Sequence, residues 1–271
     1  MAIITISRKI GSMGDKIAKM TAETLGYEYI EKAHISEGLS RCGIPISYID
    51  KYDEKKPSLW QTFSTQNELF AQCIRATVCE LAARDNVVIL GRGGQAILKN
   101  IPGILHVRVI APFKTRMSRL MEQSGDEEEN VQRLIQQSDF DSSGYLSTNF
   151  QSNIDDSDLY DLVINTRTLT LSESVEMITC AAGANMIKES PLISEKLFDF
   201  ALKHTVKAAL LEHADKGEWV DLDVHKGTAF LTGLVSSPII KNKCENFVLN
   251  IEGIKSVDSQ LTVRDQKTAI Y

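Results

Sequence analysis

The segment "AIITISRKIGSMGDKIAKMTAETLG", residues 2–26, decides how the first part of this chain folds. Residues 2–7 are mostly apolar and are typical of a buried strand, and residues 15–25 have the apolar spacing of a helix. A loop that contains Gly11 and Gly14 joins them. Strand, glycine loop and helix is the order by which nucleotide enzymes hold phosphate, because backbone N–H groups converge on an anion at a helix N-terminus.

The loop departs from the usual pattern G-x-x-x-x-G-K-[ST]. Lys9 stands at the first glycine position, Asp15 at the lysine position and Lys16 at the hydroxyl position. Lys16 is therefore turned by about 100° around the helix axis from the usual lysine, while Arg8 and Lys9 could supply charge from the other side. A plain glycine turn that is capped by the Asp15 carboxylate is the alternative interpretation.

A second glycine segment supports a phosphate site. Residues 86–91 are typical of a buried strand, and "GRGG", residues 91–94, follows it directly. The carboxyl ends of the strands carry the site in an open parallel sheet, and Arg92 could contact phosphate with two hydrogen bonds. A strand-to-helix turn with an incidental arginine is the alternative.

Strands and helices alternate through the first two-thirds of the chain, which predicts a parallel sheet with helices on both faces. The predicted strands are 2–7, 27–30, 86–91, 104–111 and 160–165, and the predicted helices are 15–25, 58–84, 113–124, 127–139 and 171–182.

The pattern changes after residue 182. Residues 183–192 are polar and predict a linker. The remainder, 193–271, predicts a small α+β unit with helices at 193–214 and 239–250. Two independently folded units are therefore expected.

Composition narrows the function classes. The chain has 271 residues and a net charge of −6, without a basic block or a long apolar run, so we expect neither a nucleic-acid partner nor a membrane. The five cysteines are scattered, and the N-terminus lacks the pattern of a signal peptide, so we expect a cytoplasmic protein with reduced thiols. No metal ligands are assigned.

Residues 1–182 resemble the cytidylate kinase-like proteins, which are P-loop relatives of the nucleoside monophosphate kinases. The matching stretches are "ITISRKIGSMGDKIAKMTAETLGYEYI", "VVILGRGGQAILKNIPGILHVRVIAPFKTRMSRLM" and "SDLYDLVINTRTLTLSESVEMI". The resemblance implies a five-stranded parallel P-loop core and transfer of phosphate from ATP to a monophosphate such as CMP, with Mg²⁺.

The resemblance also assigns residues. It implies phosphate or nucleotide binding by the loop residues, by the arginine after the third strand and by the segment after the last strand: Ser7, Arg8, Gly11, Ser12, Gly14, Lys16, Arg92, Asn165 and Thr166. It implies catalytic roles for Lys16, Arg92 and Arg116, with Arg116 and Arg119 on the helix that leads to the lid.

The lid departs from the family. Relatives often read D-R-x-R-x-x-Y-L-R-x-x-Y there, and this chain reads "SDFDSSGYLSTNF". Asp139, Tyr145 and Leu146 remain, but the basic positions are lost. Two hypotheses follow: an active phosphotransferase, or a degenerate kinase fold that binds nucleotide or another anion without turnover. A pure interaction module with a vestigial pocket is a third.

Residues 193–266 resemble a BON domain, through the strand pair around Gly227, the run 231–235, and "IEGI" followed by "VDSQLTV". BON domains are small α/β modules without catalytic residues. The resemblance implies a protein partner, or a homo-oligomer, bound through this part.

Overall fold

The structure, a computed structural model, describes residues 2–45, 49, 65–184, 191–213 and 219–264. Its first part is a five-stranded sheet, in the order β2-β3-β1-β4-β5, in which all neighbouring strands are parallel. The predicted P-loop-like parallel sheet is thus confirmed. The strands are β1 (Ile3–Arg8), β2 (Glu28–Ile30), β3 (Val87–Leu90), β4 (Ile104–Ile110) and β5 (Leu162–Asn165).

Strand β1 lies at the centre of the sheet, and this places the glycine loop. The chain continues from β1 to β2 and β3 on one side, and returns to β4 and β5 on the other. The loop after β1 therefore lies at the carboxyl edge where the strand order reverses, which is where open α/β sheets bind ligands.

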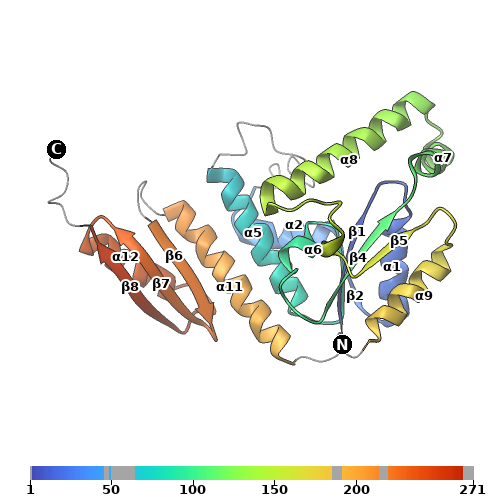
Figure 1. The fold of residues 1–271 in the computed structure, drawn as a ribbon. Helices are drawn as coiled ribbons and strands as arrows, with labels where there is room; N and C mark the ends of the chain where they lie inside the picture. Colours follow the sequence, from blue (N-terminus) through green and yellow to red (C-terminus); the bar gives the residue numbers. More distant parts are fainter. Residues whose placement is uncertain (1, 46–48, 50–64, 185–190, 214–218, 265–271) are drawn as a thin grey trace.

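Helices cover both faces of the sheet, as predicted (Figure 1). Because side chains alternate along a strand, Ile4 packs with Ile17 and Ile178 on one face, whereas Ile3 packs with Ile74 on the other. The helices of the first face are α1 (Gly14–Leu25) and α9 (Leu171–Ala182), and those of the second are α2 (Lys32–Arg41), α5 (Thr65–Ala82) and α6 (Gly94–Ile97).

Helices α7 (Phe113–Ser124) and α8 (Glu128–Phe150) form a hairpin beyond the carboxyl edge of the sheet (Figure 1). The predicted end at residue 139 is wrong, since α8 continues without a break through the family's lid segment. The last turns of α8 are stabilised because Tyr145, Leu146 and Phe150 are buried against the second face of the sheet. Sequence reasoning also missed α2 and α6, and residues 58–64 of the predicted long helix lie outside the described residues.

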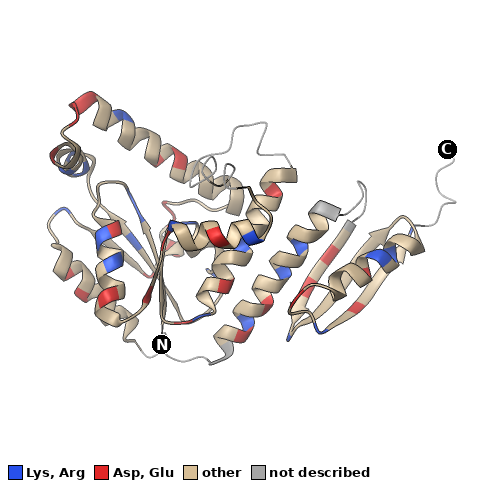
Figure 2. Ribbon diagram, turned by 180° about the vertical axis from the view of Figure 1, so that it is seen from behind, with Lys and Arg blue, Asp and Glu red and all other residues tan. Residues whose placement is uncertain are grey.

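The second part is a small α+β module, as predicted. It has a three-stranded sheet in the order β6-β7-β8, in which β6 and β7 are antiparallel and β8 is parallel to β7. Both acidic and basic positions occur along the ribbon of this module (Figure 2). Its elements are α11 (Pro191–His213), β6 (Trp219–His225), β7 (Thr228–Val235), α12 (Pro238–Leu249) and β8 (Ser256–Val263).

Helix α11 belongs to two hydrophobic cores. Ile193, Leu197 and Ala201 pack into the core of the first part, next to α5, while Val206 and Leu210 pack into the core of the small module. Figure 1 shows α11 between α5 and the small sheet. The first helix of the predicted second unit therefore completes the core of the first.

A polar contact accompanies this packing. The ring of His204 on α11 is 2.6 Å from Gln72 Oε1 on α5. Burial, followed by the charges of Arg75, Lys207 and Lys203, lowers the pKa of His204 to about 3. Because Gln72 Oε1 can only accept, the neutral ring donates through Nδ1.

Replacing Leu197 tests the packing of α11. Leu197 is fully buried, so Leu197→Ala should lower the free energy of unfolding by about 2–5 kcal/mol, as core truncations do. Phe198 is 54% exposed, and Phe198→Ala should change it by less than about 0.5 kcal/mol. Urea unfolding of the full chain measures both. Equal effects of the two variants would contradict the packing.

Candidate phosphate and nucleotide site

The loop between β1 and α1 has the backbone of a phosphate-binding turn. Gly11 has a φ of 75°, Met13 has a φ of 66°, and α1 begins at the next residue, Gly14. A Cβ at Gly14 would lie 2.4 Å from the Arg8 Cβ, so only glycine fits between the loop and β1. The first N–H groups of α1 have no partner within the helix, which leaves this end suited to an anion.

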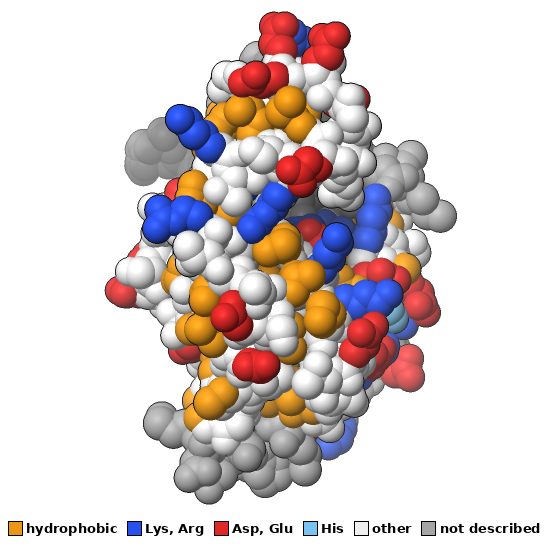
Figure 3. Space-filling view, turned by 90° about the vertical axis from the view of Figure 1, so that its right-hand side faces the viewer, with side chains coloured by type: hydrophobic (Ala, Val, Ile, Leu, Met, Phe, Trp, Pro, Cys, Tyr) orange, Lys and Arg blue, Asp and Glu red, His pale blue; other side chains and the backbone are white. Residues whose placement is uncertain are grey.

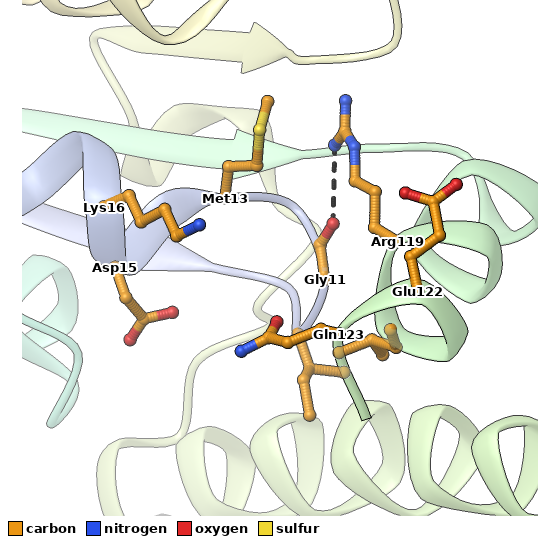
Figure 4. A pocket seen from close by; sticks show the side chains of 9 residues that line it. Gly11, Met13, Asp15, Lys16, Arg119, Glu122 and Gln123 are labelled. Atoms are coloured by element: carbon orange, nitrogen blue, oxygen red, sulfur yellow. Dashed lines mark hydrogen bonds between the residues drawn. The ribbon is translucent and has the colours of Figure 1, made fainter. Parts of the chain in front are cut away.

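A cavity of about 720 Å³ opens against this loop (Figure 4). Lys16 extends from α1 toward the loop, and Arg119 and Glu122 face it from α7 (Figure 4). On the surface that carries α7 and α9, Lys and Arg side chains surround a hollow, with acidic and apolar side chains between them (Figure 3). The full lining consists of Ile10, Gly11, Met13, Asp15, Lys16, Arg119, Leu120, Glu122 and Gln123.

Thr166 and Arg119 fix the wall of the cavity. The fully buried Thr166 hydroxyl donates to the Ser12 carbonyl at 2.9 Å and accepts from Arg119 Nη1 at 3.0 Å. Arg119 also donates to the carbonyl of Thr166 at 2.6 Å and to that of Gly11 at 3.4 Å. The structure thus brings Thr166 to the loop, whereas Asn165 is exposed and accepts from the Arg167 backbone N–H at 3.1 Å.

The charges of the loop are partly neutralised within it. Arg8 Nε donates to Asp15 Oδ1 at 3.3 Å, and the Asp15 side chain is 63% exposed. Arg8 is therefore paired with the Asp15 carboxylate. A ligand can displace this carboxylate easily, because an exposed ion pair contributes only about 0–1 kcal/mol to stability. Ser12 is fully buried, and its hydroxyl has no hydrogen-bond partner among the described residues.

Arg116 does not face the cavity. Its side chain is 4% exposed and forms two hydrogen bonds to Asp139 of α8, Nη1 to Oδ1 at 3.0 Å and Nη2 to Oδ2 at 2.7 Å. Nη1 also donates to the Ile10 carbonyl at 3.3 Å. This geometry ties α7 to α8 and to the loop, so it favours a structural role over the predicted catalytic one.

The "GRGG" segment follows β3, at the same edge as the loop. Gly91, Arg92 and Gly93 all have positive φ values, of 69°, 57° and 72°. Arg92 is 9% exposed, so most of its side chain is covered. A Cβ at Gly93 would lie 2.4 Å from the Phe150 ring, so α8 packs directly on this turn. Gly91 and Gly93 line a small cavity of about 20 Å³ together with Ser7 and Arg8.

His106 and Arg108 alternate on the predicted strand 104–111, so the sequence allows one pocket-lining role between them, and the structure brings Arg108 to the site. Its side chain is 4% exposed on β4, and Nη1 donates to Ser7 Oγ at 2.6 Å. His106, two residues before it, is 2.7 Å from Thr5 Oγ1 in the same sheet, and burial lowers its pKa, which is typical of a structural ring. The signal in the sequence was an arginine inside a predicted core strand.

The family of the first part is established by comparison. The model of the cytidylate kinase-like family matches residues 3–168, and the model of the BON domain matches residues 198–265. The chain belongs to the cytidylate kinase-like family. The small module matches a BON domain, so both resemblances drawn from the sequence are confirmed.

One relative of this chain is itself a cytidylate kinase. The chain is 28% identical over 188 residues to the cytidylate kinase of Archaeoglobus fulgidus, which covers 68% of this chain and 97% of that protein. A uronate isomerase of Corynebacterium glutamicum is 32% identical over 97 residues, which is 36% of this chain and only 19% of that protein. An uncharacterized protein from Eubacterium ventriosum shares the fold, with a TM-score of 0.52 and 20% identity over 70% of this chain and all of the other.

A measurement of stability distinguishes a structural role of Arg116 from a catalytic one. Arg116→Met should lower the free energy of unfolding by about 1–3 kcal/mol, because the Asp139 carboxylate and the Ile10 carbonyl lose a charged donor. Arg133→Met is the control. Arg133 forms an exposed ion pair with Glu129 within α8, and the loss of this pair should lower the free energy of unfolding by less than about 0.5 kcal/mol. Thermal unfolding measures both, and an unchanged melting temperature in Arg116→Met would return Arg116 to the catalytic candidates.

Proposed function

We propose that this chain binds ATP in the 720 Å³ cavity and transfers its terminal phosphate slowly to a nucleoside monophosphate, with CMP as the first candidate. The observation that carries the proposal is the position of the cavity, which opens against the phosphate-binding turn at the start of α1. CMP is chosen because a cytidylate kinase aligns over 68% of the chain.

Each part of the cavity suits a part of ATP. The N–H groups of α1 and the Lys16 ammonium would bind the phosphates. Leu120, Glu122 and Gln123 of α7 form the wall across the cavity from Lys16, and would face the nucleoside. Such a reaction needs positioning and charge, and no covalent intermediate.

Mg²⁺ would arrive with the triphosphate. Among the described residues, no group of three His, Cys, Asp or Glu side chains is placed to hold a metal ion. Magnesium in phosphate sites is commonly held by one or two carboxylates together with substrate phosphates, and Asp15 and Glu122 are the carboxylates in the lining of the cavity. Because Asp15 is paired with Arg8, Glu122 would hold a magnesium ion that is shared with ATP, and the ion would neutralise phosphate charge.

Binding without turnover is the second candidate, and three observations favour it. Asp15 stands at the usual lysine position, and the lid positions hold Phe140, Ser142 or Ser143, and Ser147. Arg116, which could have compensated, is bound to Asp139. Charge that acts mainly in the transition state affects the rate more than it affects binding.

A coupled assay of the full chain decides between the two candidates. With Mg-ATP and CMP, dCMP, UMP or AMP, we expect turnover that is detectable but below about 1 per second, which is the lower end of ordinary enzymes, and an increase in melting temperature with nucleotide. The same increase without detectable turnover would favour the second candidate. Asp15→Lys and Ser142→Arg should each raise the rate. Ordinary turnover in the wild-type chain would show that the charge is sufficient as it stands, and failure of ATP to raise the melting temperature would reject the proposal.

For the BON module we propose a protein partner, which is either a different protein or a second copy of this chain. We also propose a cytoplasmic location. After Pro191 the sequence has ten basic and eleven acidic residues, so this part has no excess of positive charge to attract anionic lipid. Within the described residues, no helix has the length and apolar character that a membrane crossing requires.

Vesicle binding tests this proposal. The full chain should stay in the supernatant when it is centrifuged with vesicles that contain 30% phosphatidylserine, because balanced surface charge gives little electrostatic attraction. A variant with lysines at Asp221 and Asp223, two exposed carboxylates of β6, should bind more than the wild type. Co-sedimentation of most of the wild-type chain at physiological salt would contradict the prediction.

A further inference from the structure

A second hollow is lined by Arg8, whose partner Asp15 lines the ATP cavity. It has a volume of about 50 Å³ and lies between the end of β1, β4, α8 and the segment that follows α8. Arg8, Lys9, Arg108, Ser142 and Asp155 are part of its lining, and we call it the Arg108 hollow. Its size suits one phosphate group, and the small cavity beside Gly91 and Gly93 shares Arg8 and Ser142 with it.

Three cations converge on the Arg108 hollow from different elements. Arg8 and Lys9 come from the end of β1 and the loop, with side chains 24% and 29% exposed, and Arg108 comes from β4, with its side chain 4% exposed. Arg108 is held in place by Ser7 Oγ at 2.6 Å and lies with its guanidinium 5.8 Å from the centre of the Tyr160 ring. This cation is therefore fixed in position before any ligand binds.

The carboxylate that faces these cations is a weak partner. Asp155 Oδ1 is 3.7 Å from Arg108 Nη2 and 3.9 Å from Lys9 Nζ, so a single oxygen is shared by two cations at more than hydrogen-bond length. The Asp155 side chain is 67% exposed. Asp139, which also lines the hollow, is already bound to Arg116 by two hydrogen bonds. A buried cation with so little compensation favours an anion.

We propose that the Arg108 hollow binds the phosphate of a phosphomonoester, with Arg108 as the fixed cation and with the phosphate taking the place of the Asp155 carboxylate. The hydroxyls of Ser142 and Ser143 in the lining can donate to the same oxygens. The inference rests on the proposed function in one respect, which is that the phosphomonoester would be the acceptor of the transferred phosphate.

The position of Arg8 supports this role. Arg8 lines the Arg108 hollow and also holds Asp15, which lines the ATP cavity, at 3.3 Å. Arg8 would thus contact a phosphate in the hollow and is linked through Asp15 to the cavity of the terminal phosphate. Arg108 would supply, from a core strand, charge that the lid segment of α8 lacks.

Calorimetric titration of the full chain tests the site, with orthophosphate, CMP and cytidine as probes. Arg108→Met should weaken the binding of orthophosphate and CMP at least tenfold, while Arg108→Lys should recover part of the loss. Asp155→Asn should strengthen both about threefold or more, because it removes the competing carboxylate. The control is Arg84→Met, at an exposed pair with Glu28, and it should change neither affinity. Cytidine, which lacks the phosphate, should bind more weakly than CMP to the wild-type chain.

The outcomes separate the two proposals. Unchanged phosphate affinity in Arg108→Met, or weaker affinity in Asp155→Asn, would overturn the Arg108 hollow. If Arg108→Met does not fold, Asp155→Asn alone carries the test, since Asp155 is exposed. CMP that binds more tightly than orthophosphate supports a phosphomonoester, and orthophosphate that binds equally well overturns that part of the proposal. Mg-ATP titration of the wild-type chain tests the proposed function separately, because it reports on the other cavity.

Discussion

The hydrogen bonds of Thr166 are the constraint on which the site depends. Its hydroxyl donates to the Ser12 carbonyl in the loop and accepts from Arg119 on α7, while its backbone N–H donates to the Ile110 carbonyl at the end of β4. Thr166, which directly follows β5, thereby joins the loop, two strands and the helix that forms the opposite wall of the cavity. Since Thr166 is fully buried, water cannot replace these bonds at low cost.

The site is rich in cations, and most of them face a carboxylate of the chain. The exposure of each carboxylate decides which cation is available to a ligand. Asp15 and Asp155 are 63% and 67% exposed, so the contacts of Arg8 and Arg108 can exchange for phosphate oxygens at little cost. Asp139 is 33% exposed and binds Arg116 through both oxygens, so this pair persists and serves the fold. A ligand phosphate would therefore displace the carboxylates of the loop and of the segment after α8, and leave the hairpin of α7 and α8 intact.

The sheet could be predicted from the sequence because it depends on local patterns. Apolar runs such as residues 104–110 specify strands by themselves, and the two glycines of the loop specify its backbone. The fate of Arg116 could not be predicted in this way, because it depends on Asp139, which lies 23 residues further along the chain. Arg108 is the opposite case. Its place in a core strand was visible, but its role depends on Ser7 and Asp155, which only the folded chain brings together.

The end of α8 links the site to the small module. Phe150 packs on Gly93, and Arg75 of α5 donates to the Asn149 carbonyl and lies 5.1 Å from the centre of the Phe150 ring. Behind Arg75, α5 packs along α11, which also belongs to the core of the BON module. Helix α8, which holds Ser142 beside Arg108, is thus packed indirectly against α11. Helix α11 lies beyond residue 168, where the match to the kinase-like family ends. The backbone around the hollow is fixed by this packing, so the exposed carboxylates are the part of the site that is free to change when an anion binds.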